Sequence, residues 1–398
     1  MPKNKRPVPR KGGTPPEEKE DVLAAALCAL ALELSEQEEA DTLGDELAGK
    51  ELEFKRLVRR YLNGSKDEIL YGAIDLASHE DVGAYQLLRA AVEEAAASVP
   101  LRREGAPPQE IDAFAIPVFV HSKGGLVEAE GFQDDEAYDA LLDSLRTGGL
   151  ESARAKIVIV RHAYDAAEAA RINYTQLHTM AKEAAAALTE KKMTEAPTLQ
   201  RSIAGWTGPA FGPDDEAVEL RFIVGFALKH ADDPFYAVPA DEAAADAYFA
   251  DRLARYRQWT QDAAPLVARC LAPRERALQL NFLYQDLFFG ARQQGMAEQA
   301  MLALMATLGA ALADVDSRSG AASAIVAPAD VDGEMVLRVQ LMDGDKVLAK
   351  GDRPFELGSD LEIEVDDVRD ALATLGITDV AVAERFDPYG RAVDPRPA

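Results

Sequence analysis

The sequence predicts an α+β protein, in which an N-terminal helical bundle precedes duplicated ferredoxin-like strand–helix units with a mostly antiparallel sheet. Two observations carry this prediction. Apolar residues recur at helical spacing up to about residue 100, and strand-like and helix-like stretches alternate after that point. In addition, one strand–helix segment, residues 156–188, has a second version at residues 277–312.

The two versions align without a gap when the numbering is shifted by 121 residues. KIVIVRHAYD (Lys156–Asp165) and ALQLNFLYQD (Ala277–Asp286) are the strands, and a polar turn and a helix follow each of them. The shared register of strand, spacer and helix favours duplication over chance similarity. The alignment places Asp165 on Asp286 and Arg171 on Arg292.

Composition indicates a soluble globular protein of two or three domains. The 398 residues are 48% hydrophobic and 28% charged, which allows a sizeable core. The formal net charge of −26 repels nucleic acid and anionic lipid over most of the surface. Cys28 and Cys270 lie far apart in the sequence, which favours a reducing compartment and excludes a disulfide framework.

The N-terminus imitates a signal peptide, because a basic segment precedes the apolar run Val22–Leu32. Four acidic residues stand directly before that run, where export signals are basic, and the run is too short to cross a bilayer. No other stretch is expected to span a membrane. The sequence therefore predicts a cytoplasmic protein whose residues 1–16 form a disordered basic tail.

Residues 17–100 are predicted to form a bundle of about four helices. Ser65 and Glu68 have the spacing of a capping box at the start of the third helix. Pro100 is expected to end the bundle. The charged, proline-containing segment 102–112 is expected to be a linker.

The rest of the chain is predicted to divide into three strand–helix units and a tail. The first strand contains Pro117, which predicts an edge position or a bulge. From Lys156 onward, with a short strand at residues 199–204, the order is strand–helix–strand twice. This is a ferredoxin-like order with helices on one face of the sheet. The predicted boundaries are residues 112–212 for the first unit, 213–316 for the second, 323–387 for a shortened third and 388–398 for a loose tail.

The sequence contains none of the familiar motifs for phosphate cradles, serine hydrolases or zinc proteases. Gly-x-x-x-x-Gly-Lys-Ser/Thr, Gly-x-Gly-x-x-Gly, Gly-x-Ser-x-Gly and His-Glu-x-x-His are all absent. The five histidines and two scattered cysteines do not have the spacing of a zinc site. No cofactor and no metal ion are therefore predicted.

The repeated acidic and basic residues are the candidate ligand-binding residues. Asp165 and Asp286 end equivalent strands, and Arg171 and Arg292 lie six residues further on, near equivalent helices. An arginine beside a helix N-terminus suits an anion. The alternative is that each aspartate caps its own turn and pairs with its own arginine. His162, near the end of the second strand of the first unit, is a further candidate without an identifiable partner.

The chain resembles a family of uncharacterised proteobacterial proteins of similar length. The resemblance lies in the helical start, in the Arg-rich second helix with the capped helix after it (Leu57–Leu76), and in the two strand–helix units. The resemblance is one of layout and covers roughly residues 22–382. It implies a bacterial cytoplasmic protein with a domain of unknown function, and it transfers no catalytic residue.

Three functions are open at this point. The first is a non-catalytic binding or scaffold protein for a protein partner or a small anionic ligand, because duplication is combined with missing catalytic motifs. The second is an enzyme of unfamiliar type that acts on a small anionic substrate, with His162 beside an acid. The third is contact with RNA or a ribosome through the basic tail. The sequence also leaves open whether the chain forms a homo-oligomer. For the binding protein, a groove between the copies would be lined by Asp165, Arg171, Asp286 and Arg292.

Overall fold

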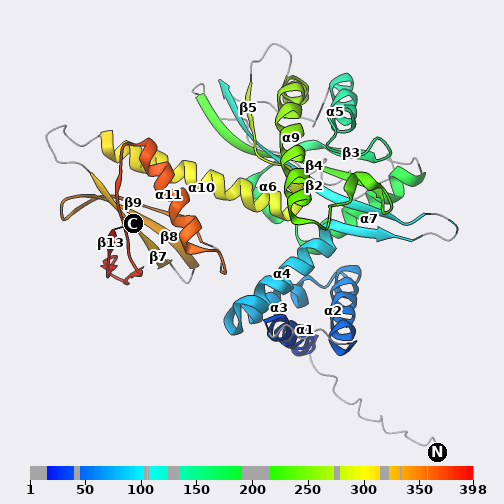
Figure 1. The fold of residues 1–398 in the computed structure, drawn as a ribbon, viewed down its shortest axis with the longest axis horizontal. Coiled ribbons are helices and arrows are strands. Elements are labelled where there is room, and N and C mark those ends of the chain that lie inside the picture. The colour runs from blue at the N-terminus through cyan, green and yellow to red at the C-terminus, as the bar shows by residue number, and fades with distance from the viewer. Residues whose placement is uncertain are drawn as a thin grey trace, which may run out of the picture. The chain divides into compact units, whose positions relative to one another are not determined.

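The computed structural model describes residues 16–39, 45–102, 107–123, 134–190, 216–272, 278–313, 322–331, 334–355 and 357–397, together with Gly105 and Phe132. Helices are combined with largely antiparallel sheets and the N-terminal part is helical, as predicted (Figure 1). Residues up to Ala95 and residues from Ala96 onward form two compact units. Residues 1–15 of the predicted basic tail lie outside the described residues.

The described part of the first unit consists of α1 (Pro16–Glu39), α2 (Asp45–Asn63), α3 (Asp67–Glu80) and α4 (Val82–Ala97), the last of which runs just past the unit boundary. Each helix turns an apolar face inward, which is why the helical spacing was visible in the sequence. The buried side chains with the largest volume in this unit are Leu27, Phe54, Leu62, Ile69, Leu70 and Leu88.

The turn between α2 and α3 differs from the predicted capping box. Ser65 has a left-handed backbone with φ of 51°. Its N–H bonds the carbonyl of Leu62, and the N–H of Lys66 bonds that of Tyr61. Ser65 therefore closes the end of α2, where left-handed residues are common, and the N-cap Lys66 of α3 makes no side-chain cap bond.

The second unit contains a sheet of six strands in which all pairs are antiparallel. The two longest strands, β2 (Gln109–Lys123) and β4 (Glu216–His230), pair along their whole length at its centre. β3 (Lys156–Asp165) lies on the outer side of β4. The outer side of β2 carries β1 (Ser98–Leu101), β6 (Asp286–Leu287) and β5 (Gln279–Phe282).

One prediction about this sheet is wrong, and another is not tested. β2 begins at Gln109, inside the segment that was predicted to be a linker. The strand predicted at residues 199–204 lies outside the described residues.

Pro117 lies in the central strand β2 and not at an edge. Its carbonyl accepts the N–H of Leu283 at 2.9 Å, so the side on which proline lacks an N–H faces β5 and β6. The outer ladder is interrupted there, because β5 pairs with β2 from Val118 onward and β6 pairs with Phe114 and Ala115. The missing donor explains why this edge consists of two short strands, and the predicted irregularity is confirmed.

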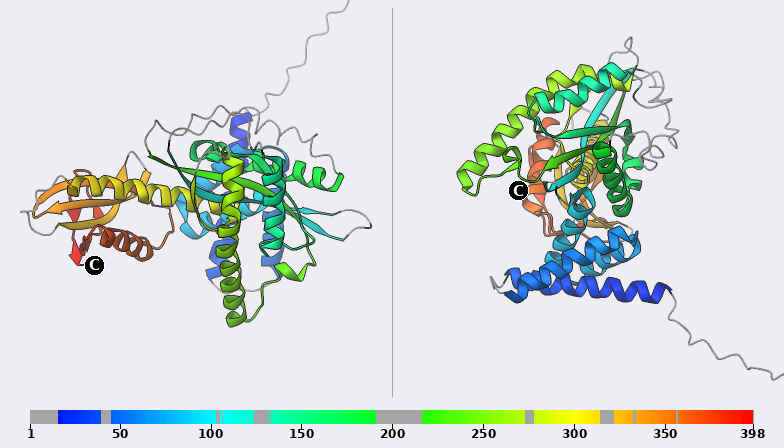
Figure 2. Two further views of the ribbon diagram at one scale, coloured as in Figure 1. Left: turned by 90° about the horizontal axis from the view of Figure 1, so that it is seen from above. Right: turned by 90° about the vertical axis from the view of Figure 1, so that its right-hand side faces the viewer.

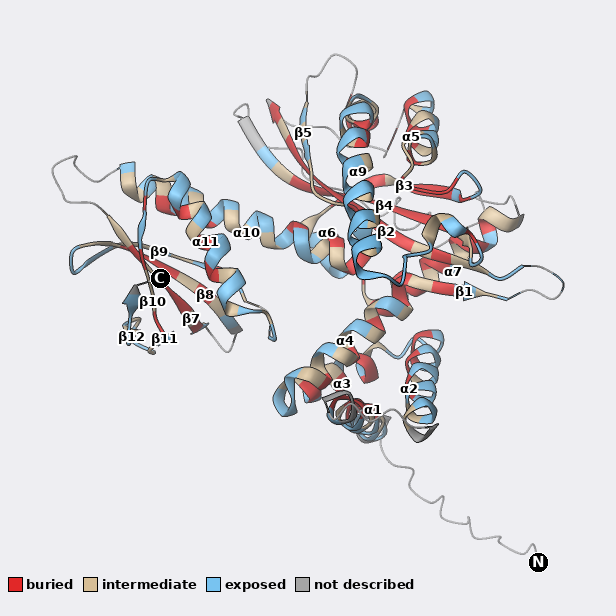
Figure 3. Cartoon of the chain, in the orientation of Figure 1, coloured by how far each residue is buried: buried red, intermediate tan, exposed pale blue. Residues whose placement is uncertain are grey.

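Helices cover both faces of the six-stranded sheet, whereas the ferredoxin-like prediction placed them on one face. α5 (Asp135–Thr147) and α9 (Glu242–Leu271) contact each other and share a core with alternate residues of β2 and β4. α10 (Phe288–Ala313) packs on the other face, where Gly295 lies against Phe222 and Pro117. Figure 3 shows how buried residues concentrate along the central strands.

The helix after β3 is broken into two. α6 (Ala166–Arg171) contacts β3 and β4, and α7 (Tyr174–Glu190) contacts strands β1 to β4. Leu177, Met180 and Ala184, which are spaced three and four residues apart on α7, are buried. None of them belongs to the core beneath α5 and α9.

A second sheet follows, built from β7 (Ser323–Val331), β8 (Glu334–Asp343), β9 (Lys346–Pro354), β10 (Asp379–Val382) and β13 (Arg396–Pro397). Its order is β13-β10-β7-β8-β9, and α11 (Leu361–Thr374) connects β9 to β10, which is parallel to β7. β7, β8 and β9 follow one another without a helix between them, which speaks against a third copy of the strand–helix unit.

The segment after residue 387 is more ordered than predicted. β12 (Ala392–Val393) pairs with β11 (Arg385–Phe386), and β13 pairs with β10. The prolines that suggested a loose tail are compatible with these short edge strands, because proline is tolerated at sheet edges.

α10 packs against both sheets. Its start contacts β2, and further along the helix Leu304 contacts Gly351 of β9 (Figure 2). By length and composition alone this helix could cross a membrane, which the sequence analysis overlooked. Core helices of other proteins have the same properties, and Phe288, Phe289, Leu304 and Leu308 are buried here. Most of the rest of the helix is not buried.

Candidate functional site

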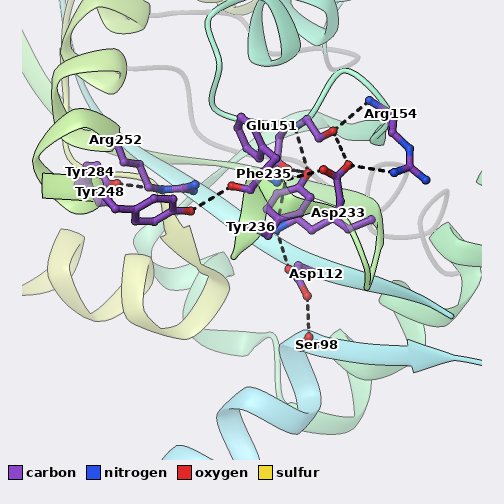
Figure 4. A network of polar contacts seen from close by, with 12 residues as sticks. Ser98, Asp112, Glu151, Arg154, Asp233, Phe235, Tyr236, Tyr248, Arg252 and Tyr284 are labelled. Atoms are coloured by element: carbon purple, nitrogen blue, oxygen red, sulfur yellow. Dashed lines mark hydrogen bonds and ion pairs between the residues drawn. The ribbon is translucent and has the colours of Figure 1, made fainter. Parts of the chain in front are cut away.

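A buried group of charged and hydroxyl side chains lies at one end of the six-stranded sheet (Figure 4). It joins β2 and β4 to the segment between α5 and β3 and to the short 3-10 helix η2 (Pro234–Tyr236) after β4. We call it the polar node. Its members are Asp112, Glu151, Ser152, Lys229, Asp233 and Tyr236.

Lys229 is the cation of the polar node. Its Nζ lies 2.7 Å from Oδ2 of Asp112 and 3.8 Å from Oε2 of Glu151. It also lies 4.6 Å from the centre of the Tyr236 ring, within range of a cation–π contact. Asp112 accepts a further hydrogen bond from the hydroxyl of Ser98 at 2.6 Å.

Tyr236 links the two connecting segments. Its hydroxyl donates to Oε2 of Glu151 at 2.7 Å and accepts the backbone N–H of Ser152 at 3.0 Å. The hydroxyl of Ser152 in turn donates to Oδ2 of Asp233 at 2.6 Å. Asp233 also caps η2 by accepting the N–H of Phe235.

Burial changes the protonation equilibria of the polar node. It raises the pKa of the Glu151 carboxyl, although the charge of Lys229 acts in the opposite direction. Burial lowers the pKa of Lys229, but the carboxylates of Glu151 and Asp112 more than offset this effect, so the pKa is raised. The pKa of Tyr236 is raised, mainly by burial and to a smaller extent by the charge of Glu151. The pKa of Asp233 is lowered, mainly by the hydrogen bond from Ser152.

The polar node therefore fastens two connections to the end of the sheet. Lys229 contacts Asp112 and Glu151, and Oδ2 of Asp233 lies 4.0 Å from Nη1 of Arg154, so each carboxylate has a cation nearby, as buried charges require. The polar node was not predicted from the sequence, because Asp112 was assigned to a linker. A usable signal existed: Lys229 shares its side of β4 with Ile223 and Ala227, which belong to the core, and a lysine at such a position demands a buried partner.

At the other end of β3 the structure brings His162 and Asp165 together through Glu168. His162 is 2% exposed, and its Nε2 lies 3.1 Å from Oε2 of Glu168. Asp165 is the N-cap of α6: its side chain accepts the N–H of Glu168, and Glu168 accepts the N–H of Asp165. The expectation that Asp165 caps its own turn is confirmed, and the unidentified partner of His162 is Glu168.

Arg221 is the basic residue opposite Asp165. The two residues are in register across β3 and β4, and Arg221 is 1% exposed. One of its Nη atoms lies 3.0 Å from Oε2 of Glu219. Burial raises the pKa of Glu219, although Arg221 acts in the opposite direction. Arg171 was thus not the residue to expect beside Asp165, because the sheet supplies Arg221.

Asp286 lies in β6 on the opposite edge of the sheet, with β4 and β2 between it and β3. Its side chain is exposed, accepts the N–H of Leu287 and lies beside Gly290. The predicted groove lined by both aspartates is therefore wrong, because Asp165 and Asp286 stand on different edges.

Arg292 reaches the corner between α6 and α7, next to the segment that contains Arg171. Arg292 of α10 donates from Nη1 to the carbonyls of Ala169 and Ile172, at 3.2 and 3.3 Å. Arg171 is an exposed residue in the last turn of α6, between these two carbonyls in the sequence. We call this place the α6–α7 corner; it consists of Ala169, Arg171, Ile172 and Arg292.

Metal binding receives no support from the described residues, which contain no group of three or more histidines, cysteines and carboxylates placed to hold an ion. No protein-family model, curated protein or solved structure matches the chain. The proteobacterial resemblance therefore stays a prediction.

Proposed function

We propose that residues 109–190 and 216–313 are two copies of one strand–helix–strand–helix unit that together form a ferredoxin-like sheet. β2 and β3 are the strands of the first copy, and β4 with the interrupted β5–β6 edge are those of the second. The strand order β3-β4-β2-β5/β6 supports this proposal. In it, the first strands of the copies pair at the centre, and each second strand pairs with the first strand of the other copy.

Strand register supports the same proposal. Asp165 of the first copy pairs with Arg221 in the first strand of the second copy, and Asp286 of the second copy pairs with Ala115 in the first strand of the first copy. Each second strand also has an irregularity before this aspartate, between Ile159 and Ala163 in β3 and between β5 and β6. A shared defect at a shared position is expected of copies.

For the function, we propose a non-catalytic cytoplasmic binding protein that takes a small oxyanion at the α6–α7 corner. One observation carries this proposal: Arg292 of the second copy reaches the corner of the first copy that holds Arg171. Arginine pairs are suited to carboxylates and phosphates because their donors match two oxygen atoms at once. The aromatic rings of Phe288 and Phe289, whose centres lie 5.6 and 4.9 Å away, support the Arg292 guanidinium.

Calorimetric titration of the full chain with inorganic phosphate at low salt tests this function. The affinity is expected to fall about tenfold or more in Arg171→Gln and in Arg292→Gln, since each removes a charge-assisted contact. Arg257→Gln changes an exposed arginine of α9 and serves as the matched control. Binding that is absent in the native chain, or equal in all four proteins, would refute the anion site.

A second candidate, an enzyme acting on a small anionic substrate, is favoured by the contact between His162 and Glu168. A histidine held by a carboxylate suits a general base, but this base must also reach its substrate, and His162 is 2% exposed. His162→Ala with unchanged melting and unchanged cellular phenotype would count against it. Contact with RNA through the basic tail lies outside the described residues and remains a prediction.

A further inference from the structure

The helix after the second strand is broken in one copy and continuous in the other. In the first copy α6 ends at Arg171 and α7 begins at Tyr174. The shift of 121 residues places this break inside α10, which runs from Phe288 to Ala313 without interruption. The break is therefore a feature of the first copy and not of the repeated unit.

Two side chains hold the break. Asn173 caps α7, because its Oδ1 accepts the N–H of Gln176 at 2.8 Å. Arg292 satisfies the carbonyls of Ala169 and Ile172, which end α6. Carbonyls at a helix end lack their usual partners within the helix, and here the carbonyl of Ala169 accepts the N–H of Ile172 in addition to Arg292. Arg292 is itself the residue that the repeat aligns with Arg171.

We infer that Arg292 is a latch that keeps α6 folded over His162, and that an oxyanion releases it. This inference rests on the proposed anion site. An oxyanion binds a guanidinium more strongly than neutral carbonyls do, so a bound oxyanion competes for Arg292. A helix of six residues is too short to be stable alone, so α6 relies on its capping box, on packing against β3 and β4 and on Arg292.

Release of the latch has a defined consequence for the buried histidine. Glu168 lies in the first turn of α6, and its carboxylate holds both His162 Nε2 and the N–H of Asp165. When α6 loosens, Glu168 loses its place and His162 becomes accessible to solvent. The α6–α7 corner thus couples the occupancy of an anion site to the exposure of His162.

Hydrogen exchange of the full chain, read by mass spectrometry, tests the latch without any ligand. The N–H of Ile172, bonded to Ala169, and that of Glu168, bonded to Asp165, are the reporters. Arg292→Gln is expected to speed the exchange of these two amides about tenfold or more. In Arg292→Lys the exchange rates should lie between those of Arg292→Gln and those of the native chain. Amides of the β2–β4 ladder should not change, which shows that the variant is folded, and Arg257→Gln is the control.

A second arm adds inorganic phosphate to the native chain and should speed exchange at the same two amides. Unchanged exchange in Arg292→Gln overturns the latch, whatever phosphate does. Phosphate that binds without changing these amides also overturns it, while leaving the proposed anion site intact. Failure of phosphate to bind refutes the anion site and with it release by an oxyanion, and the variant then tests whether Arg292 holds α6.

Discussion

Lys229 of β4 and Asp112 of β2 form a partly buried ion pair across the central ladder, with Nζ 2.7 Å from Oδ2 and the side chains 17% and 16% exposed. The pair is diagonal, because Asp112 is in register with Ala227, two residues before Lys229. Glu151, which is 2% exposed, also relies on this lysine. Lys229 thus contacts two carboxylates at the end of the sheet, and the charge of Arg252 also acts on Glu151.

Replacement of Lys229 by methionine should destabilise the second unit strongly. The substitution keeps an unbranched side chain but removes the cation that contacts Asp112 and the buried Glu151, which costs about 3–5 kcal/mol of unfolding free energy. Urea unfolding followed by tryptophan fluorescence measures this change, since Trp259 is buried in this unit. Arg369→Met removes an exposed ion pair with Asp366 and should stay within about 0.5 kcal/mol of the native chain. An equal loss in both variants would contradict the prediction.

Glu151→Gln should change how stability depends on pH. The pKa of Glu151 is raised above 4.5 in the folded chain, so the folded state holds this proton more tightly than the unfolded state. The contribution of Glu151 to the unfolding free energy therefore falls as the pH rises from 4.5 through the folded pKa. Glutamine does not titrate, so the variant lacks this decrease. The unfolding free energy of the variant minus that of the native chain should rise between about pH 4 and pH 8. A flat difference over this range would disprove the assignment.

Tyr236→Phe should weaken the polar node and flatten its response to alkali. The buried Glu151 loses a hydrogen bond and the N–H of Ser152 loses an acceptor, which costs roughly 1–3 kcal/mol at neutral pH. The pKa of Tyr236 is raised above 10.0 in the folded chain, so the native protein loses stability as the pH rises beyond 10.0. Phenylalanine does not titrate, and denaturant unfolding at neutral and alkaline pH should show a shallower loss. A steeper loss in the variant would exclude this role.

Gly225→Ala should destabilise the centre of the six-stranded sheet. Gly225 is in register with Phe114, and a Cβ at this position would lie 2.3 Å from Cζ of the phenylalanine ring. The ring must move within a packed core, which costs roughly 1–3 kcal/mol. Phe114→Leu made in the same chain should recover part of the loss, and a double-mutant cycle measures the coupling. Simple additivity of the two changes would mean that the ring does not limit this site.

Most features that depend on neighbouring residues were predictable from the sequence, although the capping box expected at Ser65 is not formed. The four helices of the first unit and the cap at Asp165 follow from local spacing, because helix faces and caps involve residues three or four positions apart. Strand partners do not follow in this way. Gln109 pairs with His230, and nothing near Gln109 indicates that the strand continues into a segment that was assigned to a linker.

The same distinction between local features and distant partners applies to the candidate site residues. His162 and Arg292 were selected from the sequence as polar residues near strand and helix ends, but their partners come from packing. Glu168 reaches His162 from α6, which directly follows β3, and His162 itself lies in the irregular stretch between Ile159 and Ala163. Arg292 reaches the first copy because α10 lies beside α6. The polar node was missed for the same reason, since its members are spread from Asp112 to Tyr236.

The pairing of β2 with β4 also determines when this protein can fold during synthesis. When β2 leaves the ribosome, its main partner has not yet been translated, and one long side of the strand must wait for β4. A nascent chain that stalls before residue 216 exposes an apolar strand edge of the kind that recruits other chains. Chaperone capture of the nascent chain is therefore expected to begin with β2 and to end once β4 has emerged.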